Sequence, residues 1–288
     1  MPNKNNLIDT FIDYKKKELS PRSQVEYIRD LTQLEIWLKG MDKTLRSANR
    51  RDIDSYIHTV PVGKRMTNRK LSVIRTFYNY LLTQELITKN PTSDIKRIKA
   101  DRLLPRILTQ TELNIIFNYD LYPKNSFKSI LFSTIVMTMY YTGVRVSELL
   151  GIDYPDIDIE TRQIRVLGKG RKERMVKFSL TLLNWFHSYE HYREQHIKPG
   201  EIAWFISDRG RRLTINMVEA LFRRFKDKTG AHIHPHLLRH TFASHGMAKG
   251  MTLAEVQQLL GHESIASTGI YTHVVPGRAG EAYDKAFK

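Results

Sequence analysis

The chain has 288 residues, enough for two domains, and its 41% hydrophobic content supplies apolar material for buried cores, which excludes a disordered chain. Lys and Arg outnumber Asp and Glu by 46 to 30, so a formal net charge of +16 favours a polyanionic partner, nucleic acid first. The absence of cysteine excludes disulfides, thiolate metal sites and cysteine nucleophiles.

The first hundred residues have the apolar spacing of a small helical bundle. No signal sequence opens the chain, so the expected location is cytoplasmic and no membrane partner is expected. Ser20 and Pro21 are a helix cap and first-turn pair, and Gly40 is the expected stop. The spacing predicts helices from near residue 7, from 21 to 40, from about 47 or 51, and from about 67 to 81.

Basic residues gather at two places in this half. One is a candidate DNA-contact patch made of Lys64, Arg65, Arg69 and Lys70. The simpler interpretation of this patch is a basic helix face that only contacts solvent. Residues 96–106 have the composition of a basic linker. The predicted organisation is therefore a helical DNA-binding domain over 1–95, a linker over 96–106 and a second domain over 107–288.

The second domain is predicted to be mainly helical with a small antiparallel β-sheet. Thr109 or Thr111 can cap a helix that has Glu112 in its first turn. The apolar run over 130–141 spans about twelve residues where a membrane crossing needs roughly twenty, so it is interpreted as a buried core helix. Alternation over 157–178 predicts a meander, and helices are expected over about 181–192 and 214–228. The second turn of the meander is glycine-flanked and basic, with Lys169 as a candidate proton donor and Arg171 and Lys172 as candidate DNA contacts.

Arg145 is expected at the start of a helix. Gly143 ends the apolar helix before it in a conformation that glycine adopts cheaply, and the chain becomes helical again at Arg145. A cation is disfavoured at a helix N-terminus, so Arg145 needs either a bound anion or Glu148, one turn later, as its partner. From these residues alone, a surface Arg145–Glu148 pair and an anion site are equally supported.

A second group of polar residues follows Pro235. His236 and Arg239 are three apart, so on a helix they share one face and can reach one target. His236 and His240 have the spacing of zinc ligands, but Leu237 stands where a hydrolytic zinc motif needs glutamate. His240, among apolar neighbours, is expected to be a supporting, hydrogen-bonded histidine, and no metal site is predicted.

The last motifs are weak singly and informative together. Thr252 and Glu255 form a capping box, Gly261 ends the helix, and His262 follows it, with Tyr271 nine residues later. Arginines can fork onto phosphate oxygens, a tyrosine can attack phosphorus when a histidine assists it, and a lysine can protonate the leaving oxygen. Because the chain has no GK[ST] phosphate loop and no paired carboxylates, metal-dependent nuclease and ATPase chemistry are disfavoured.

These motifs resemble those of the tyrosine recombinases in order and spacing. The matching segments are 142–149, Lys169 between glycines, 235–243, 259–262 and 270–274. The compact chain is similar to the Xer type, and the basic helical half resembles the family's core DNA-binding domain more loosely. Gly269 is a local departure, since a polar residue is commoner there, but it removes no catalytic group.

The resemblance implies a C-terminal α+β catalytic domain in which Arg145, Lys169, His236, Arg239 and His262 surround the scissile phosphate, with Tyr271 as nucleophile. It implies a 3′-phosphotyrosyl intermediate that needs neither ATP nor metal, and no cofactor. It also implies that the partner is double-stranded DNA with a specific recombination site. The expected assembly is a homotetramer, or a tetramer with a paralogous recombinase, that exchanges strands through a Holliday junction. The tail, about 279–288, is similar to the family's C-terminal docking helix.

Three other functions compete with site-specific recombination. A type IB topoisomerase uses a similar residue set, but the small size and the tail argue against it. A DNA-binding accessory protein with a decayed site is disfavoured by the intact residue set, and the zinc hydrolase by Leu237. Chromosome dimer resolution, transposon cointegrate resolution and mobile-element integration or excision all remain compatible with the sequence.

Overall fold

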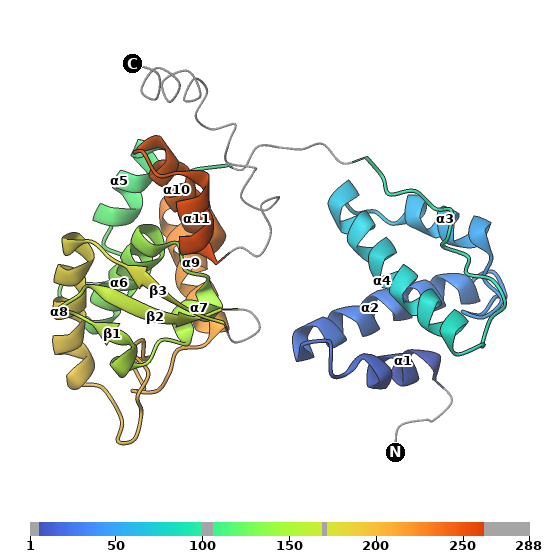
Figure 1. Cartoon of the computed structure of the whole chain (residues 1–288), viewed down its shortest axis with the longest axis horizontal. Helices are drawn as coiled ribbons and strands as arrows, with labels where there is room; N and C mark the ends of the chain where they lie inside the picture. Colours follow the sequence, from blue (N-terminus) through green and yellow to red (C-terminus); the bar gives the residue numbers. More distant parts are fainter. Residues whose placement is uncertain (1–5, 100–105, 169–171, 262–288) are drawn as a thin grey trace. The chain divides into compact units, whose positions relative to one another are not determined.

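The computed structural model describes residues 6–99, 106–168 and 172–261. The chain divides into two compact units, Met1–Arg102 and Leu103–Lys288, and each is described by itself (Figure 1). The first unit is helical, while the second combines helices with a small sheet.

The N-terminal unit is a helical bundle closed around its own apolar core. Ser20 caps the second helix by accepting from the Ser23 amide, with Pro21 in its first turn, as the sequence predicted. Phe11, Leu34 and Phe77, from three different helices, are fully buried in the core. The helices are α1 (Leu7–Lys15), α2 (Pro21–Lys39), α3 (Arg50–Thr59) and α4 (Lys64–Thr83).

Helix α4 begins three residues earlier than the sequence pattern predicted. Gly63 is its extended N-cap and makes no side-chain cap hydrogen bond. The apolar periodicity becomes visible only at Thr67, since Lys64 and Arg65 are exposed in the first turn. The early start therefore places both cations at the N-terminal end of the helix.

Part of the segment expected to be a linker is docked on the N-terminal unit. The Asn68 side chain bonds both the amide and the carbonyl of Ile98, at 2.9 and 2.8 Å. Ile98 also packs against the core of this unit. At the other end, Arg106 donates to the carbonyl of His232 in the second unit. The predicted linker, 96–106, is thus attached at each end.

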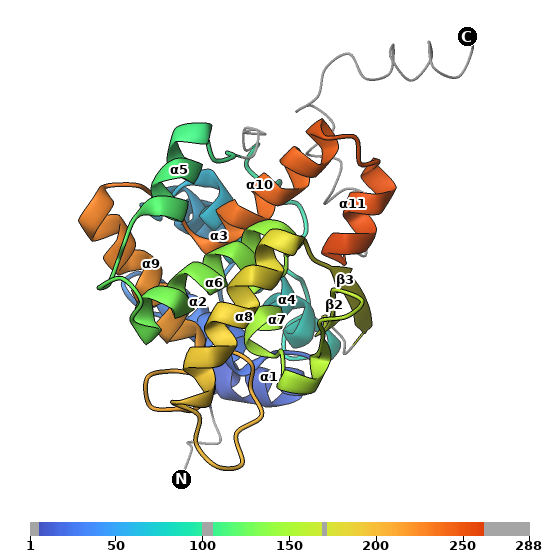
Figure 2. The ribbon, with the colours of Figure 1, turned by 90° about the vertical axis from the view of Figure 1, so that its left-hand side faces the viewer.

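The C-terminal unit is built around one buried helix, α6 (Phe127–Thr142). Most of its side chains are buried and it has no separate polar face, which is typical of a core helix, and it packs against both α8 and α10 (Figure 2). This confirms the predicted core helix. Thr109 caps α5 in a capping box with Glu112, also as predicted. The other elements are α5 (Gln110–Asn118), α7 (Val146–Leu150), the short 3₁₀ helix η1 (Tyr154–Asp156), α8 (Leu180–Glu194), α9 (Ile215–Thr229), α10 (Pro235–Ala248) and α11 (Leu253–Leu260).

A three-stranded antiparallel sheet, in the order β1-β2-β3, covers one side of the unit. Its strands are β1 (Ile157–Asp158), β2 (Gln163–Leu167) and β3 (Glu173–Lys177), with Ile164 opposite Val176. These two side chains are fully buried, so the alternation that predicted the meander reflects a half-buried sheet. Ile159 and Phe178, included in the prediction, lie just outside the strands. Within the described ranges, no helix is both long and apolar enough to cross a membrane.

Candidate active site

Gly143 forms the bend that places Arg145. It ends α6 in the left-handed conformation, with φ of 65°. A Cβ atom at this position would lie 2.4 Å from Cδ1 of Phe242, so both the backbone angle and the space require glycine. Arg145 follows as the N-cap of α7. The bend therefore ends a buried helix and immediately presents an arginine at the start of the next one, as the sequence predicted.

Glu148 is buried, which the sequence-based picture of a surface Arg145–Glu148 pair did not include. Its side chain is only 3% exposed, while its carboxylate accepts from the Arg145 amide at 2.8 Å and from Arg145 Nη1 at 2.7 Å. Burial by itself would raise the pKa of Glu148, but hydrogen bonds from Arg174 and Arg145 outweigh it and hold that pKa below its usual range. Glu148 is therefore an anion that orders the start of α7.

Arg239 reaches the same place from α10. It is buried and donates to the carbonyl oxygens of Gly143, at 2.6 Å, and Leu260, at 2.7 Å. Its Nη1 also lies 3.8 Å from Glu148 Oε2. Arg145 and Arg239 thus share the Glu148 carboxylate and the carbonyl of Leu260, to which Arg145 Nη1 donates at 3.5 Å.

Arg174, on β3, belongs to this cluster and was missed by sequence reasoning. Its Nη1 and Nη2 donate to the two oxygens of Glu148, at 3.1 and 2.8 Å, and its Nε donates to Leu259 O at 2.9 Å. Helix α11 lies against β3, so the arginine reaches the end of that helix (Figure 1). Its spacing of two residues from buried Val176 puts it on the inner face of the strand, but that pattern does not indicate which group it would bind.

His236 lies in the first turn of α10, one turn before Arg239. It is exposed, but desolvation by its neighbours, together with the positive charges of Arg239 and Arg145, lowers its pKa. The imidazole is therefore neutral at neutral pH. His240 is half-buried, and burial, then the charges of His236 and Arg239, lowers its pKa as well. Across the described ranges, no group of His, Asp or Glu side chains is arranged to hold a metal ion.

Several predicted site residues lie outside the described residues: Lys169, Arg171, His262, Tyr271 and the tail 279–288. The residues beside three of them are described. The Gly168 amide donates to Lys172 O at 2.8 Å, next to the Glu148 cluster, where a Cβ on Gly168 would meet Arg174. Gly261 ends α11 with φ of 62°, packed on the Arg174 guanidinium. Lys172 itself is exposed.

The predicted basic patch in the N-terminal unit divides into two pairs. Lys64 and Arg65 are exposed. Lys70, in contrast, is buried and its ammonium lies 3.0 Å from the buried carboxylate of Asp30, while Arg69 Nη2 lies 2.6 Å from the same group. Arg69 and Lys70 are thus bound internally, joining α4 to α2, which the helix pattern alone could not indicate.

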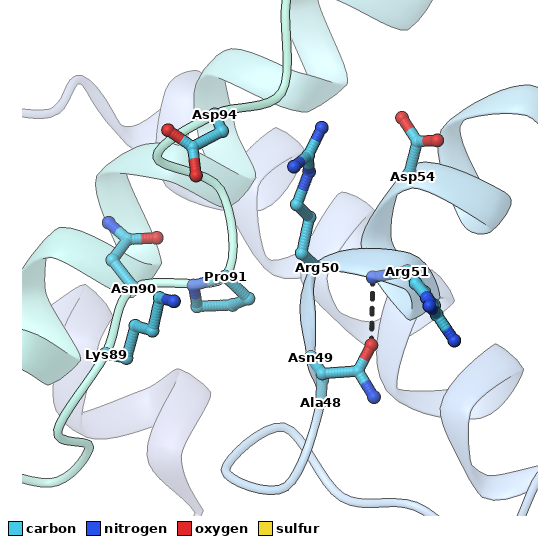
Figure 3. Close-up of a pocket in the computed structure, with 9 residues that line it drawn as sticks. All are labelled: Ala48, Asn49, Arg50, Arg51, Asp54, Lys89, Asn90, Pro91 and Asp94. Atoms are coloured by element: carbon cyan, nitrogen blue, oxygen red, sulfur yellow. Dashed lines mark hydrogen bonds between the residues drawn. The ribbon is translucent and has the colours of Figure 1, made fainter.

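A pocket of about 720 Å³ in the N-terminal unit lies between the start of α3 and the segment after α4. Figure 3 shows Arg50 projecting into the space between Asp94, on that segment, and Asp54, on α3. Arg51 and Lys89 also line it. Because both cations and carboxylates line it, the pocket is of mixed charge.

Comparisons with known proteins cover both units. Residues 106–278 match the model described as the phage integrase family, and residues 8–85 match the phage integrase N-terminal SAM-like domain. The tyrosine recombinase XerC of Serratia marcescens is 32% identical over 288 residues, which cover 97% of this chain and 93% of the relative. The tyrosine recombinase XerD of Chlorobaculum tepidum is 32% identical over 282 residues, covering 93% and 91%.

Solved structures agree on the fold. The crystal structure of XerA recombinase matches 99% of each chain at 26% identity, with a TM-score of 0.52. XerH site-specific recombinase bound to palindromic difH substrate, in a post-cleavage complex, matches 96% of this chain and 94% of its own at 20% identity and a TM-score of 0.73. The Tn1549 transposon integrase with transposon right end DNA matches 98% and 99% at 17% identity and a TM-score of 0.77.

Proposed function

The chain belongs to the phage integrase family, the tyrosine recombinases, and is of the Xer type, and from this premise we propose how it breaks and rejoins DNA at specific sites. The observation that carries the proposal is the convergence of Arg145 and Arg239 on Glu148 and on the carbonyl of Leu260. Two guanidinium groups held together in this way form a site for a phosphodiester, since each can fork onto nonbridging oxygens.

The reaction is a reversible transesterification. The Tyr271 hydroxyl attacks the scissile phosphorus, a bond from its oxygen to phosphorus forms, and the bond to the 5′ oxygen breaks. Neutral His236 accepts the tyrosine proton, Lys169 protonates the leaving 5′ oxygen, and His262 binds the phosphate. Arg145 and Arg239 stabilise the charge that spreads over the nonbridging oxygens. Because the phosphotyrosyl bond conserves the energy of the broken bond, ATP and metal ions are not required.

Strand exchange needs more than one chain. We propose that four protomers, all copies of this chain or two of a paralogous recombinase, assemble on two duplexes and exchange strands in pairs through a Holliday junction. Residues 279–288 are the proposed segment for docking on a neighbouring protomer. The basic N-terminal unit binds the duplex beside the cleavage site, in keeping with the net charge of +16.

The first experiment measures covalent attachment of the protein to DNA. Plasmid DNA that carries the sequences flanking this protein's own gene is incubated with the protein in chelator and quenched with detergent. The wild type is expected to form a protein–DNA adduct, and Tyr271→Phe none. A wild type without an adduct despite tight binding to a mapped site would contradict catalysis by this chain alone.

A second experiment separates recombination from relaxation. Two copies of the mapped site are placed on one supercoiled plasmid, and the products are examined for exchange between the sites. Recombination yields deletion or inversion products in proportion to adduct formation. Relaxed circles without exchanged products would instead identify a topoisomerase.

A further inference from the structure

The cluster around Glu148 contains one more positive charge than phosphate binding uses. Arg145, Arg174 and Arg239 all lie within 3.8 Å of the same carboxylate. A carboxylate has one negative charge, so the cluster retains two net positive charges when Glu148 is ionised. The lowered pKa of Glu148 keeps it ionised at neutral pH.

The three arginines are engaged to different extents. All three kinds of nitrogen in the Arg174 guanidinium donate to internal acceptors: Nη1 and Nη2 to Glu148, and Nε to Leu259 O. Its side chain is 14% exposed. The Arg145 guanidinium donates to Glu148 through Nη1 alone, and its side chain is 31% exposed, more than that of Arg174. Arg174 is therefore the arginine that Glu148 holds by both oxygens.

We propose that Arg174 is a positioning residue that acts as the main counter-ion of Glu148, and so limits how far Glu148 draws the guanidinium groups of Arg145 and Arg239 away from the scissile phosphate. The inference rests on the proposed function, because the phosphate is the ligand for which these groups are kept. Glu148 has to stay ionised and in place, since it accepts the Arg145 amide and orders the start of α7. Arg174 supplies the two-pronged contact to this carboxylate, so the Arg145 guanidinium contributes a single donor and Arg239 stays 3.8 Å away.

Loss of Arg174 changes this balance. Glu148 would remain a buried anion with only Arg145 and Arg239 to compensate it, and both would be drawn into closer contact with it. A phosphate would then have to compete with Glu148 for the same N–H donors. Leu259 O, at the end of the helix that precedes His262, would also lose its donor.

The test is a suppressor experiment on DNA cleavage. Arg174→Ala is expected to slow single-turnover adduct formation about 100-fold, the loss typical of misplaced catalytic groups, while DNA affinity stays within about threefold. Adding Glu148→Gln to Arg174→Ala removes the competing charge but keeps a carbonyl for the Arg145 amide. The double variant is expected to react about tenfold faster than Arg174→Ala alone.

Arg165→Ala is the matched control. Arg165 lies on the same hairpin, on β2, and its exposed guanidinium pairs with Asp156 rather than with Glu148. Its removal is expected to leave the cleavage rate within about twofold of wild type, as for an exposed surface pair. Arg174→Lys, which keeps a charge but cannot fork onto both oxygens, is expected to give an intermediate rate, and it replaces Arg174→Ala in the suppressor test if the alanine variant does not fold.

The outcomes are distinct. Unchanged cleavage in Arg174→Ala would overturn the inference. So would a double variant that is as slow as Arg174→Ala or slower, because a purely structural role gives no rescue when a second contact is removed. If the wild type forms no adduct at a site that it binds tightly, catalysis by this chain alone fails, whatever the effect of Arg174. A wild type that forms the adduct, with no effect at Arg174, refutes only the inference.

Discussion

At the scale of single residues, Gly143 makes a clear prediction about stability. Gly143→Ala forces an L-residue into a positive φ and brings its Cβ to 2.4 Å from Phe242 and 2.8 Å from Leu260. The two costs together are expected to lower the free energy of unfolding by about 3 kcal/mol. Urea unfolding of the full chain, followed by circular dichroism, measures it.

Gly230 provides the control for Gly143. It ends α9 with φ of 73°, also in the left-handed region, but an added Cβ would meet nothing within 4 Å. Gly230→Ala is therefore expected to cost only the backbone preference, about 1 kcal/mol. Equal decreases in the free energy of unfolding for Gly143→Ala and Gly230→Ala would contradict the close packing of Gly143 against Phe242.

His236 makes a prediction about pH. Its pKa is lowered from 6.5, so the ring is neutral at and above that pH and becomes protonated only at more acidic pH. If the neutral ring accepts the tyrosine proton, the cleavage rate should be level near pH 7 and fall along a limb whose midpoint lies below 6.5. Single-turnover cleavage between about pH 5 and 8 measures this limb. His236→Gln should abolish it, and a wild-type midpoint above 6.5 would contradict a neutral His236.

At the scale of elements, a buried ion pair joins α2 to α4. Asp30 is 1% exposed and holds both Lys70 and Arg69. Asp30→Ala leaves the Lys70 ammonium buried without its carboxylate. It is therefore expected to lower the free energy of unfolding by about 3–5 kcal/mol. Urea unfolding measures the loss, and amide hydrogen exchange should show that it falls on α2 and α4 rather than on α6.

Glu35→Ala is the control for Asp30→Ala. Glu35 lies on the same helix and pairs with Lys39, whose side chain is 65% exposed. Exposed pairs of this kind contribute about 0–1 kcal/mol, so little change is expected. If Glu35→Ala lowered the free energy of unfolding as much as Asp30→Ala, burial of the Asp30 pair would not be the cause of its effect.

The elements also show what sequence can and cannot predict. Ser20, Thr109 and Thr252 were recognised as caps because a cap depends only on residues within one turn. Arg145, His236 and Arg239 were predicted as site residues from short motifs that resemble those of the family, and their catalytic roles stay predictions. Lys70 and Arg174 were misjudged or missed because the carboxylates that hold them lie 40 and 26 residues away in the chain. Their roles follow from how helices and strands pack, which local spacing does not encode.

At the scale of the whole molecule, the net charge of +16 predicts salt-dependent DNA binding. Each phosphate contact removed should reduce the slope of log affinity against log salt by about 0.9. Lys64 and Arg65 are exposed, so Lys64→Ala with Arg65→Ala is expected to weaken binding and to reduce the slope by up to about 2. Filter binding or fluorescence anisotropy over a salt series measures both quantities.

Lys39→Ala is the control for that double variant. It also removes an exposed cation from the N-terminal unit, but at the C-terminal end of α2, away from the start of α4 in the sequence. Its effect on the salt slope should be small. An unchanged slope in the Lys64 and Arg65 variant would identify the start of α4 as an ordinary solvated face.

The two separate cores have a consequence for target search. Each unit has its own large apolar cluster, so if both bind DNA as proposed, the chain acts as two binding modules on one covalent tether. Once one module binds the duplex, the other is confined near it at an effective concentration of about millimolar. The affinity of the whole chain for DNA can then exceed the affinity of either module alone by about 10² to 10⁴. Each module can then release and rebind while its tethered companion keeps the protein on the DNA.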